Sequence, residues 1–363
     1  MITISTLPQH LPALDGIRAV AALGIVVTHV SFQTGTGWAL AERFDYFVAV
    51  FFALSAFVLW RRPVNQHYYR NRTARIAPAY LVCVSAVILL FPEARTMDIW
   101  QILTNLTLTQ LYIPDGLAPG LTHLWSLCVE VAFYLALPVI AWAMRRLSRR
   151  GRLAAIISAA VLSFAWPWLP FVAAFDGEGI NFQIWPPSYI LWFAIGMLAA
   201  ECEGRVKISS RIRPLAWLLA AAIMWVASRE WFGPQGLVHP EPAEFNRRIL
   251  AGGLFAACIV VPYALGGPSK ILESTTWQFL GKISYSIFLW HVAILGLMFP
   301  LTGISLFSGH FTLIFILTVA FTIAVSYASY ELIEEPARLY FRGRKRQATA
   351  AAAKPATKTE SPA

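Results

Sequence analysis

The sequence predicts an all-α, polytopic membrane protein with about ten transmembrane helices. Of its 363 residues, 58% are hydrophobic and only 13% are charged, and the mean hydropathy is +0.59. A soluble domain keeps roughly a quarter of its residues charged, so this chain carries too few charges to coat a surface that faces water. The composition therefore excludes a soluble enzyme, a disulfide scaffold and a disordered chain.

Ten apolar stretches are long enough to cross a hydrocarbon core of about 30 Å. The segment 97–112 is too polar and too short to cross, and it predicts a helix lying in the membrane interface. All of these elements belong to one membrane-embedded domain, residues 1–341. The ten spans are expected near residues 16–36, 44–60, 76–92, 123–144, 153–171, 184–200, 214–231, 247–266, 280–300 and 311–331.

The distribution of Lys and Arg sets the orientation. With the N-terminus inside the cell, 23 of the 29 Lys and Arg residues fall on the cytoplasmic side and five on the other side, as the positive-inside rule requires. One missed span would invert every later loop, so this asymmetry supports ten spans and two cytoplasmic termini. Residues 342–363 predict a disordered, basic cytoplasmic tail. The net charge of +10 thus indicates membrane lipids, and not nucleic acid, as partners.

Ionisable side chains within a span are costly and mark a functional site by default. Arg18 and His29 are eleven residues apart, which returns to within about 20° of the same helix face with a rise of about 16 Å. Depths counted along the spans place His29, Glu130 and His291 near one level of the membrane. We expect the Glu130 carboxylate to orient His29 as a general base. The alternative is that each histidine only hydrogen-bonds a neighbouring helix.

A pair of arginines begins the third span. Arg72 and Arg75 are three residues apart and therefore lie side by side on one helical face. Paired guanidinium groups bind phosphate, and with Arg18 they would form a cytoplasmic mouth for a polyphosphate ligand. A lipid headgroup is the alternative ligand.

No spacing in the chain predicts a metal site. The four cysteines fall in or beside apolar runs at no metal-ligand spacing, and they are expected to be small hydrophobic residues. The sequence contains no P-loop, no GxSxG elbow and no HExxH motif, so a soluble hydrolase or kinase has no support.

Five sequence blocks occur in order between residues 11 and 340. They are LDGIRAVAALGIVVTHVSF, which holds Arg18 and His29, RTAR at 72–75, HLWSLCVEVAFYLALP at 123–138, GKISYSIFLWH at 281–291 and YELIEEP at 330–336. Together they resemble acyltransferase family 3, integral membrane enzymes that O-acylate extracytoplasmic glycans and glycolipids. Ala56 stands where this family commonly has glycine, and Val131 replaces a second acidic residue. We expect no fused extracytoplasmic esterase-like domain.

The resemblance implies transfer of an acyl group, usually acetyl, from cytoplasmic acyl-CoA to a hydroxyl of an extracytoplasmic glycan or glycolipid, in a bacterial cell membrane. It implies that Arg18, Arg72 and Arg75 bind the phosphates of the donor. His29 and Glu130 would be the catalytic residues, with direct transfer or an acyl-histidine intermediate as possible routes. The sequence predicts neither the acceptor nor the oligomeric state. The residues expected to line the acceptor site are His123, Trp125, Ser126, Tyr285 and His291.

Two other functions fit part of the sequence. A proton-coupled secondary transporter or lipid flippase would use His29, Glu130 and His291 as a proton relay. That function does not account for the arginine pair in phase with Arg18. A lipid-anchoring scaffold without chemistry is the third hypothesis, and it predicts that substitutions of His29 and Glu130 have no phenotype.

Overall fold

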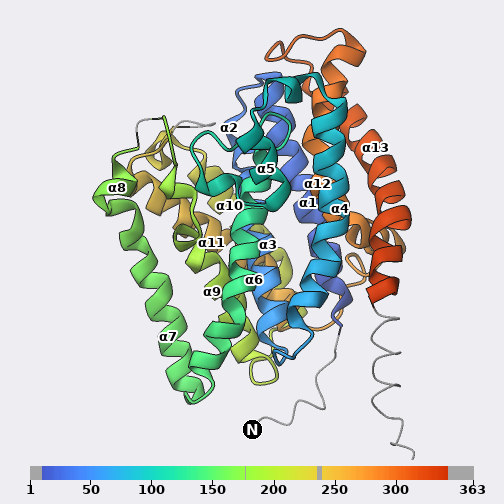
Figure 1. Ribbon diagram of the computed structural model, residues 1–363. Coiled ribbons are helices and arrows are strands. Elements are labelled where there is room, and N and C mark those ends of the chain that lie inside the picture. Colours follow the sequence, from blue (N-terminus) through green and yellow to red (C-terminus); the bar gives the residue numbers. More distant parts are fainter. Residues whose placement is uncertain (1–9, 176, 235–238, 342–363) are drawn as a thin grey trace, which may run out of the picture.

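The computed structural model describes residues 10–175, 177–234 and 239–341. These residues form a helical bundle without strands, apart from one isolated bridge between Ile208 and Gly266 (Figure 1). The all-α, polytopic prediction is confirmed, since nine helical segments in the described ranges are long and apolar enough to cross a membrane. They are α1 (Pro12–Thr34), Ala39–Trp60 with α2 (Ala39–Glu42) and α3 (Phe47–Trp60), α4 (Tyr68–Leu90), Thr122–Met144 with α6 (Trp125–Met144), Arg149–Trp168 with α7 (Arg149–Leu162), Ser210–Ala227 with α10 (Arg213–Ala227), α11 (Pro242–Ala264), α12 (Thr275–Thr302) and Phe311–Phe341 with α13 (Phe311–Ser329).

The remaining predicted span, residues 184–200, forms a shorter helical element than the nine segments above. It consists of a 3₁₀ turn, Pro186–Tyr189, followed by α9 (Ile190–Cys202). Two successive prolines open this element, and proline has no N–H to donate within a regular α-helix. The element still joins the two ends of the bundle, because Gln183 before it bonds to Pro240 near the start of α11, while Glu203 after it pairs with Arg61 at the end of α3.

The first and last described helices meet at the same end of the bundle. Gln278, near the start of α12, donates to the carbonyl oxygen of Pro12 at 2.8 Å. Lys282 lies 3.2 Å from the carboxylate of Glu331, which follows α13. Two chain ends on one side require an even number of crossings, so α9 completes ten passes in the described part of the chain. The predicted tail, 342–363, lies outside the described residues.

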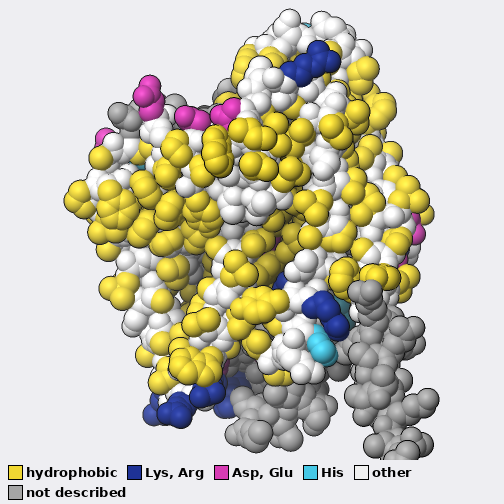
Figure 2. Space-filling model, viewed as in Figure 1, with side chains coloured by type: hydrophobic (Ala, Val, Ile, Leu, Met, Phe, Trp, Pro, Cys, Tyr) yellow, Lys and Arg dark blue, Asp and Glu magenta, His cyan; other side chains and the backbone are white. Residues whose placement is uncertain are grey.

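The two ends of the bundle differ in charge. Figure 2 shows Lys and Arg mainly toward the lower edge, with one further group near the top, and Asp and Glu mainly at the upper left, with hydrophobic side chains between the two ends. We call the end that carries the loops at 61–67, 145–148 and 203–209 the basic end, and the other the opposite end. The polarity of the fold therefore follows the loop assignment made from the sequence.

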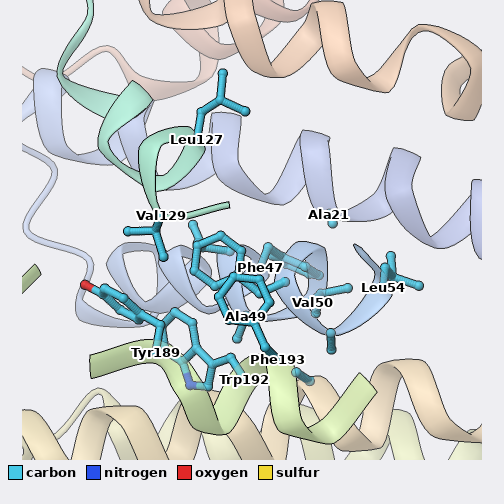
Figure 3. Packing of buried hydrophobic residues seen from close by; sticks show 14 of the residues in the cluster. Ala21, Phe47, Ala49, Val50, Leu54, Leu127, Val129, Tyr189, Trp192 and Phe193 are labelled. Carbon is cyan, nitrogen blue, oxygen red and sulfur yellow. The ribbon is translucent and has the colours of Figure 1, made fainter. Parts of the chain in front are cut away.

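The helix α3 lies at the centre of the core. Figure 3 shows Phe47, Ala49, Val50 and Leu54 of this helix packed among residues of α1, α6 and α9. Glycines permit this closeness, since a Cβ at Gly196 of α9 would lie 2.0 Å from the Ala53 carbonyl oxygen of α3. Small residues let membrane helices approach backbone to backbone. The same helices supply the walls of the functional site.

The segment predicted to lie in the interface forms a short helix, α5 (Ile99–Thr107), followed by the 3₁₀ turn Gln110–Tyr112. A capping box between Asp98 and Gln101 starts α5, in which each side chain accepts from the backbone N–H of the other residue. With nine residues, α5 is too short to cross a bilayer. Gln101 and Gln110 instead help to wall a cavity at the opposite end.

Candidate active site

A cavity of about 510 Å³ lies at the basic end, and Arg18, Arg72 and Arg75 all line it. We call it the arginine cavity. Among the described residues, its wall holds seven cationic and four acidic side chains, an excess of three positive charges. This excess makes the arginine cavity a site for anions. The charged wall residues are Arg18, Arg61, Arg62, Arg72, Arg75, Lys282 and Arg338, with Asp15, Glu130, Glu334 and Glu335.

Two helices bring the three predicted arginines together. Arg18 on α1 is held by Asp15, one turn earlier, with 2.7 Å between Nη1 and the carboxylate oxygen Oδ1. Arg72 and Arg75 occupy the second turn of α4, and the guanidinium carbon of Arg72 lies 6.0 Å from the ring centre of Tyr134. The charges of Arg18 and Arg75 are close enough to interact. The predicted three-arginine mouth is therefore present as a geometric feature.

Glu130 belongs to the arginine cavity. Its carboxylate accepts hydrogen bonds from the hydroxyl of Ser55 and from that of Tyr134, the latter at 2.5 Å. The predicted pairing of Glu130 with His29 is wrong. The residue beside His29 is instead His123, in the turn that precedes α6. Glu130 follows His123 by seven residues, which places its carboxylate about 10 Å nearer the basic end.

A second cavity, of about 1160 Å³, occupies the opposite half of the bundle. His29, His123, Trp125 and Ser126 line it, and we call it the histidine cavity. Its wall holds two cationic and four acidic side chains among the described residues, an excess of two negative charges. These charged residues are Arg43 and Arg248, with Glu42, Asp45, Asp115 and Glu241.

One further histidine on this wall, His239, adds no positive charge near neutral pH. It lies in a loop outside the membrane-spanning helices, before α11. Burial lowers the pKa of its imidazole, and the nearby Glu241 carboxylate opposes that shift only in part. The histidine cavity therefore keeps its acidic character.

Three histidines from three helical segments meet at the inner side of the histidine cavity. The ring centres of His29 and His291 are 4.9 Å apart, and those of His123 and His291 are 4.8 Å apart. His291 Nε2 lies 3.0 Å from His29 Nδ1. We call these residues the histidine cluster. In the described ranges, no group of three or more His, Cys, Asp or Glu side chains is arranged to hold a metal ion.

The hydrogen bonds of the cluster define its tautomers. His291 Nδ1 lies 3.1 and 2.8 Å from the carbonyl oxygens of Ile287 and Phe288, so this nitrogen carries the proton and donates. The Nε2 atom of neutral His291 is then an acceptor. His29 Nδ1 lies 3.0 Å from the Ile25 carbonyl oxygen and 3.0 Å from this Nε2 atom, so its one N–H is shared between the two acceptors. His29 Nε2 keeps its lone pair, which is the state required of a general base.

Two of the residues predicted to line the acceptor site lie away from the histidine cavity. Tyr285 lines the arginine cavity, and its hydroxyl donates to the Ile76 carbonyl oxygen at 2.9 Å. His291 is fully buried and lines neither cavity. Both residues lie on α12, and Tyr285 is six residues, or about 9 Å, nearer the basic end. The other three predicted residues, His123, Trp125 and Ser126, line the histidine cavity.

The transporter hypothesis required His29, Glu130 and His291 in one relay. His29 and His291 are hydrogen-bonded, but Glu130 bonds Ser55 and Tyr134 in the other cavity. The acidic member of that relay is therefore missing from the histidine cluster.

Several polar residues of the arginine cavity were missed by sequence reasoning. Tyr134 could have been found, since it follows Glu130 by four residues on the same helical face. Glu334 lies in a π-helical turn, Tyr330–Glu334, a local distortion that often marks functional sites. Ser55 gives no local signal, because only the packing of α3 against α6 brings it to Glu130.

Val48, Ser126 and Phe288 line both cavities and form the boundary between them. The molecule is thus a polytopic membrane protein in which an arginine-lined cavity with an excess of positive charge and an acidic, histidine-lined cavity meet inside one helical bundle. The family described as "Acyltransferase domain", acyltransferase family 3, matches residues 11–331, and the chain belongs to it.

The curated relatives are bacterial. The chain is 24% identical over 383 residues to the O-acetyltransferase OatA of Staphylococcus aureus (strain NCTC 8325 / PS 47). This alignment covers 91% of the chain and 58% of that relative. It is 23% identical over 378 residues to the peptidoglycan O-acetyltransferase OatA of Listeria monocytogenes serovar 1/2a, covering 93% of this chain and 58% of that relative. The chain thus spans less than two thirds of their length. No solved structure matches it. Its helices and relatives make it a multi-pass protein of a bacterial cell membrane.

Proposed function

We propose that this protein is an O-acyltransferase that moves an acetyl group from cytoplasmic acetyl-CoA to a hydroxyl of an extracytoplasmic glycan or glycolipid. The single observation that carries the proposal is the meeting of two oppositely charged cavities, one holding Arg18, Arg72 and Arg75, the other His29. The positive-inside distribution supports a cytoplasmic basic end. The names of the relatives, O-acetyltransferases, support the acyl group and the acceptor atom.

The arginine cavity suits a CoA donor. CoA carries a pyrophosphate and a 3′-phosphate, and guanidinium groups bind phosphate oxygens through paired charge-assisted hydrogen bonds. Arg18 and His29 are separated by a rise of about 16 Å along α1, a distance that an extended pantetheine arm covers. The donor phosphates would bind at the basic end while the thioester reaches the histidine cluster.

The histidine cavity suits an uncharged, hydroxyl-rich acceptor. Its acidic excess repels polyphosphates, which favours the arginine cavity for CoA and a sugar for the opposite side. Trp125 and Tyr189 offer apolar faces on its wall, with ring centres 5.2 Å apart. Aromatic faces of this kind bury the apolar side of a ring-shaped ligand.

In the proposed reaction, His29 Nε2 takes the proton of the acceptor hydroxyl. The hydroxyl oxygen then forms a bond to the thioester carbonyl carbon, the carbon–sulfur bond breaks, and the CoA thiolate receives the proton from the His29 imidazolium. The Ile25 carbonyl oxygen and His291 Nε2 share the Nδ1–H of His29 and hold the ring in place. Glu130 acts in the arginine cavity through Ser55 and Tyr134, and not as the partner of His29.

Sided proteoliposomes test the proposed function. Acetyl-CoA labelled in the acetyl group is supplied at the basic end, and extracted envelope glycan from a bacterial relative at the other. Labelled glycan is the expected product, and proton uptake without labelled glycan would favour the transporter. A burst of acetylated protein without acceptor would reveal the acyl-histidine route. Mass spectrometry of envelope glycans from a deletion strain is expected to show the loss of one acetyl group.

A further inference from the structure

The boundary between the two cavities contains one bulky side chain. Val48 of α3, Ser126 of α6 and Phe288 of α12 line both cavities. Val48 and Ser126 are small and buried, with exposed fractions of 9% and 4%. Phe288 is only half-buried, and the rest of its ring faces the cavities. The size of any opening between the cavities therefore depends mainly on where the Phe288 ring lies.

The ring of Phe288 lies between a wall of the arginine cavity and the histidine cluster. Its centre is 6.2 Å from that of Phe51, which lines the arginine cavity. On the other side, the centres of His123 and His291 are 5.3 Å and 6.1 Å away. A group that travels from the arginines to His29 has to pass this ring.

The position of Phe288 along α12 agrees with this path. Tyr285, three residues earlier, lines the arginine cavity, and Val292, four residues later, lines the histidine cavity. Residues at these spacings share one helical face. One face of α12 therefore runs from the proposed donor site to the acceptor site, with Phe288 at the crossing.

We propose that Phe288 determines which acyl groups reach the histidine cluster, and that its ring closes the passage when no donor is bound. This inference rests on the proposed function. A two-carbon acetyl group requires a small displacement of the ring, whereas each further methylene has to be inserted into a packed boundary, which is unfavourable. The enzyme is therefore specific for short acyl groups because of the aromatic ring at 288.

A series of acyl-CoA donors tests the limit on acyl length. The kcat/KM values of acetyl-, propionyl-, butyryl- and hexanoyl-CoA are measured for the parent protein and for Phe288→Ala. The ratio of hexanoyl to acetyl transfer is expected to rise about tenfold or more in the variant, because truncation removes the packed ring. Phe32→Ala is the matched control, since Phe32 lines only the histidine cavity and pairs with Phe307 at 5.9 Å.

The control separates the passage from general loosening. An equal rise in the ratio for Phe32→Ala and Phe288→Ala, or no rise for Phe288→Ala, would overturn the proposal for acyl length. Phe288→Leu repeats the measurement with a smaller change in volume, in case the alanine variant does not fold. A ratio between those of the parent and Phe288→Ala is expected for it.

Cysteine labelling tests the passage without any acyl transfer. The reporter is Thr28→Cys, next to His29 on the histidine cavity wall, in a chain with Cys202 and Cys258 replaced by serine. A charged methanethiosulfonate reagent is added at the basic end. Labelling is expected to be about tenfold faster when Phe288 is alanine, and bound CoA is expected to slow it.

The two measurements distinguish the possible failures. Equal labelling rates with and without the Phe288 ring would overturn the closed passage, whatever the transfer assay gives. Faster labelling of the Phe288→Ala variant, together with no acyl transfer by the parent protein, would support the closed passage and refute the proposed function. The limit on acyl length would then be refuted as well. Faster labelling with an unchanged donor ratio would overturn the limit on acyl length alone.

Discussion

The two cavities of this protein share several helices but differ in charge. The helices α1, α3 and α12, together with α6 and the turn before it, each contribute to both walls, yet the arginine cavity has an excess of three positive charges and the histidine cavity an excess of two negative ones. This contrast would allow the bundle to separate an anionic donor from an uncharged acceptor by charge. In the proposed reaction, the reacting groups meet where the walls join, at Val48, Ser126 and Phe288.

The largest expected effect is on the histidine side. Replacing His29 by alanine removes the proposed general base, a role that contributes about 10²- to 10⁴-fold to rate. We expect kcat for acetyl transfer to fall by that factor, while the KM for acetyl-CoA stays within about threefold, since the donor phosphates bind in the other cavity. Thr28→Ala, on the adjacent position, is the control. A folded His29→Ala protein with undiminished transfer would remove the catalytic assignment.

The next effect belongs to the arginine side. Arg72→Met removes one charged donor from the proposed phosphate site, and a hydrogen bond to a charged group contributes about 1.5–3 kcal/mol. The KM for acetyl-CoA is therefore expected to rise about 10- to 100-fold with little change in kcat. Arg145→Met, at the basic end but outside the cavity wall, should leave KM unchanged. Equal effects of both substitutions would mean that the arginines only attract anionic lipid or set the topology.

A smaller effect is expected for the residue that holds His29. His291→Leu removes one of the two acceptors of the His29 Nδ1–H and leaves the Ile25 carbonyl oxygen as the other. The His29 ring is then held less firmly, so kcat should fall about tenfold without a change in either KM. Gln at the same position offers a carbonyl acceptor and is expected to restore part of kcat. If leucine and glutamine reduced kcat equally, His291 would be a packing residue only.

The smallest effect on activity is expected for an ion pair at the edge of the arginine cavity. Arg61 and Glu203 join α3 to the end of α9, and their side chains are 7% and 8% exposed. Breaking a buried pair costs about 3–5 kcal/mol, so Glu203→Gln should lower the melting temperature by several degrees. The KM for acetyl-CoA should change less than threefold, in contrast to Arg72→Met. A large rise in KM with unchanged thermal stability would assign Arg61 to the donor.

Much of the fold could be predicted from the sequence, because length and hydropathy determine where a chain crosses a membrane. The positions of Arg72 and Arg75 were also predictable, since three residues along one helix fix their relation. The same is true of Arg18 and His29 on α1. The polarity of the bundle followed from the loop charges.

The partner of His29 could not be predicted. In a membrane bundle, residues that face lipid and residues that face other helices are both apolar, so the pattern of a span does not reveal how it is rotated or shifted along its axis. A shift of α6 by one or two turns along its axis is enough to separate Glu130 from His29. His291 and His123 lie beside His29 instead. The shortening of α9 also depends on local chemistry, the two prolines at 186 and 187, which hydropathy does not register.

Because one face of α12 borders both cavities, we expect this helix to couple the proposed donor site to the proposed acceptor site. Any tilt of α12 that widens one cavity also moves the wall of the other. CoA in the arginine cavity is therefore expected to change the affinity of the histidine cavity for the acceptor, and the acceptor is expected to change the affinity for CoA by the same factor. Acceptor affinities measured with and without desulfo-CoA would reveal this coupling, and identical values would show that α12 does not couple the two cavities.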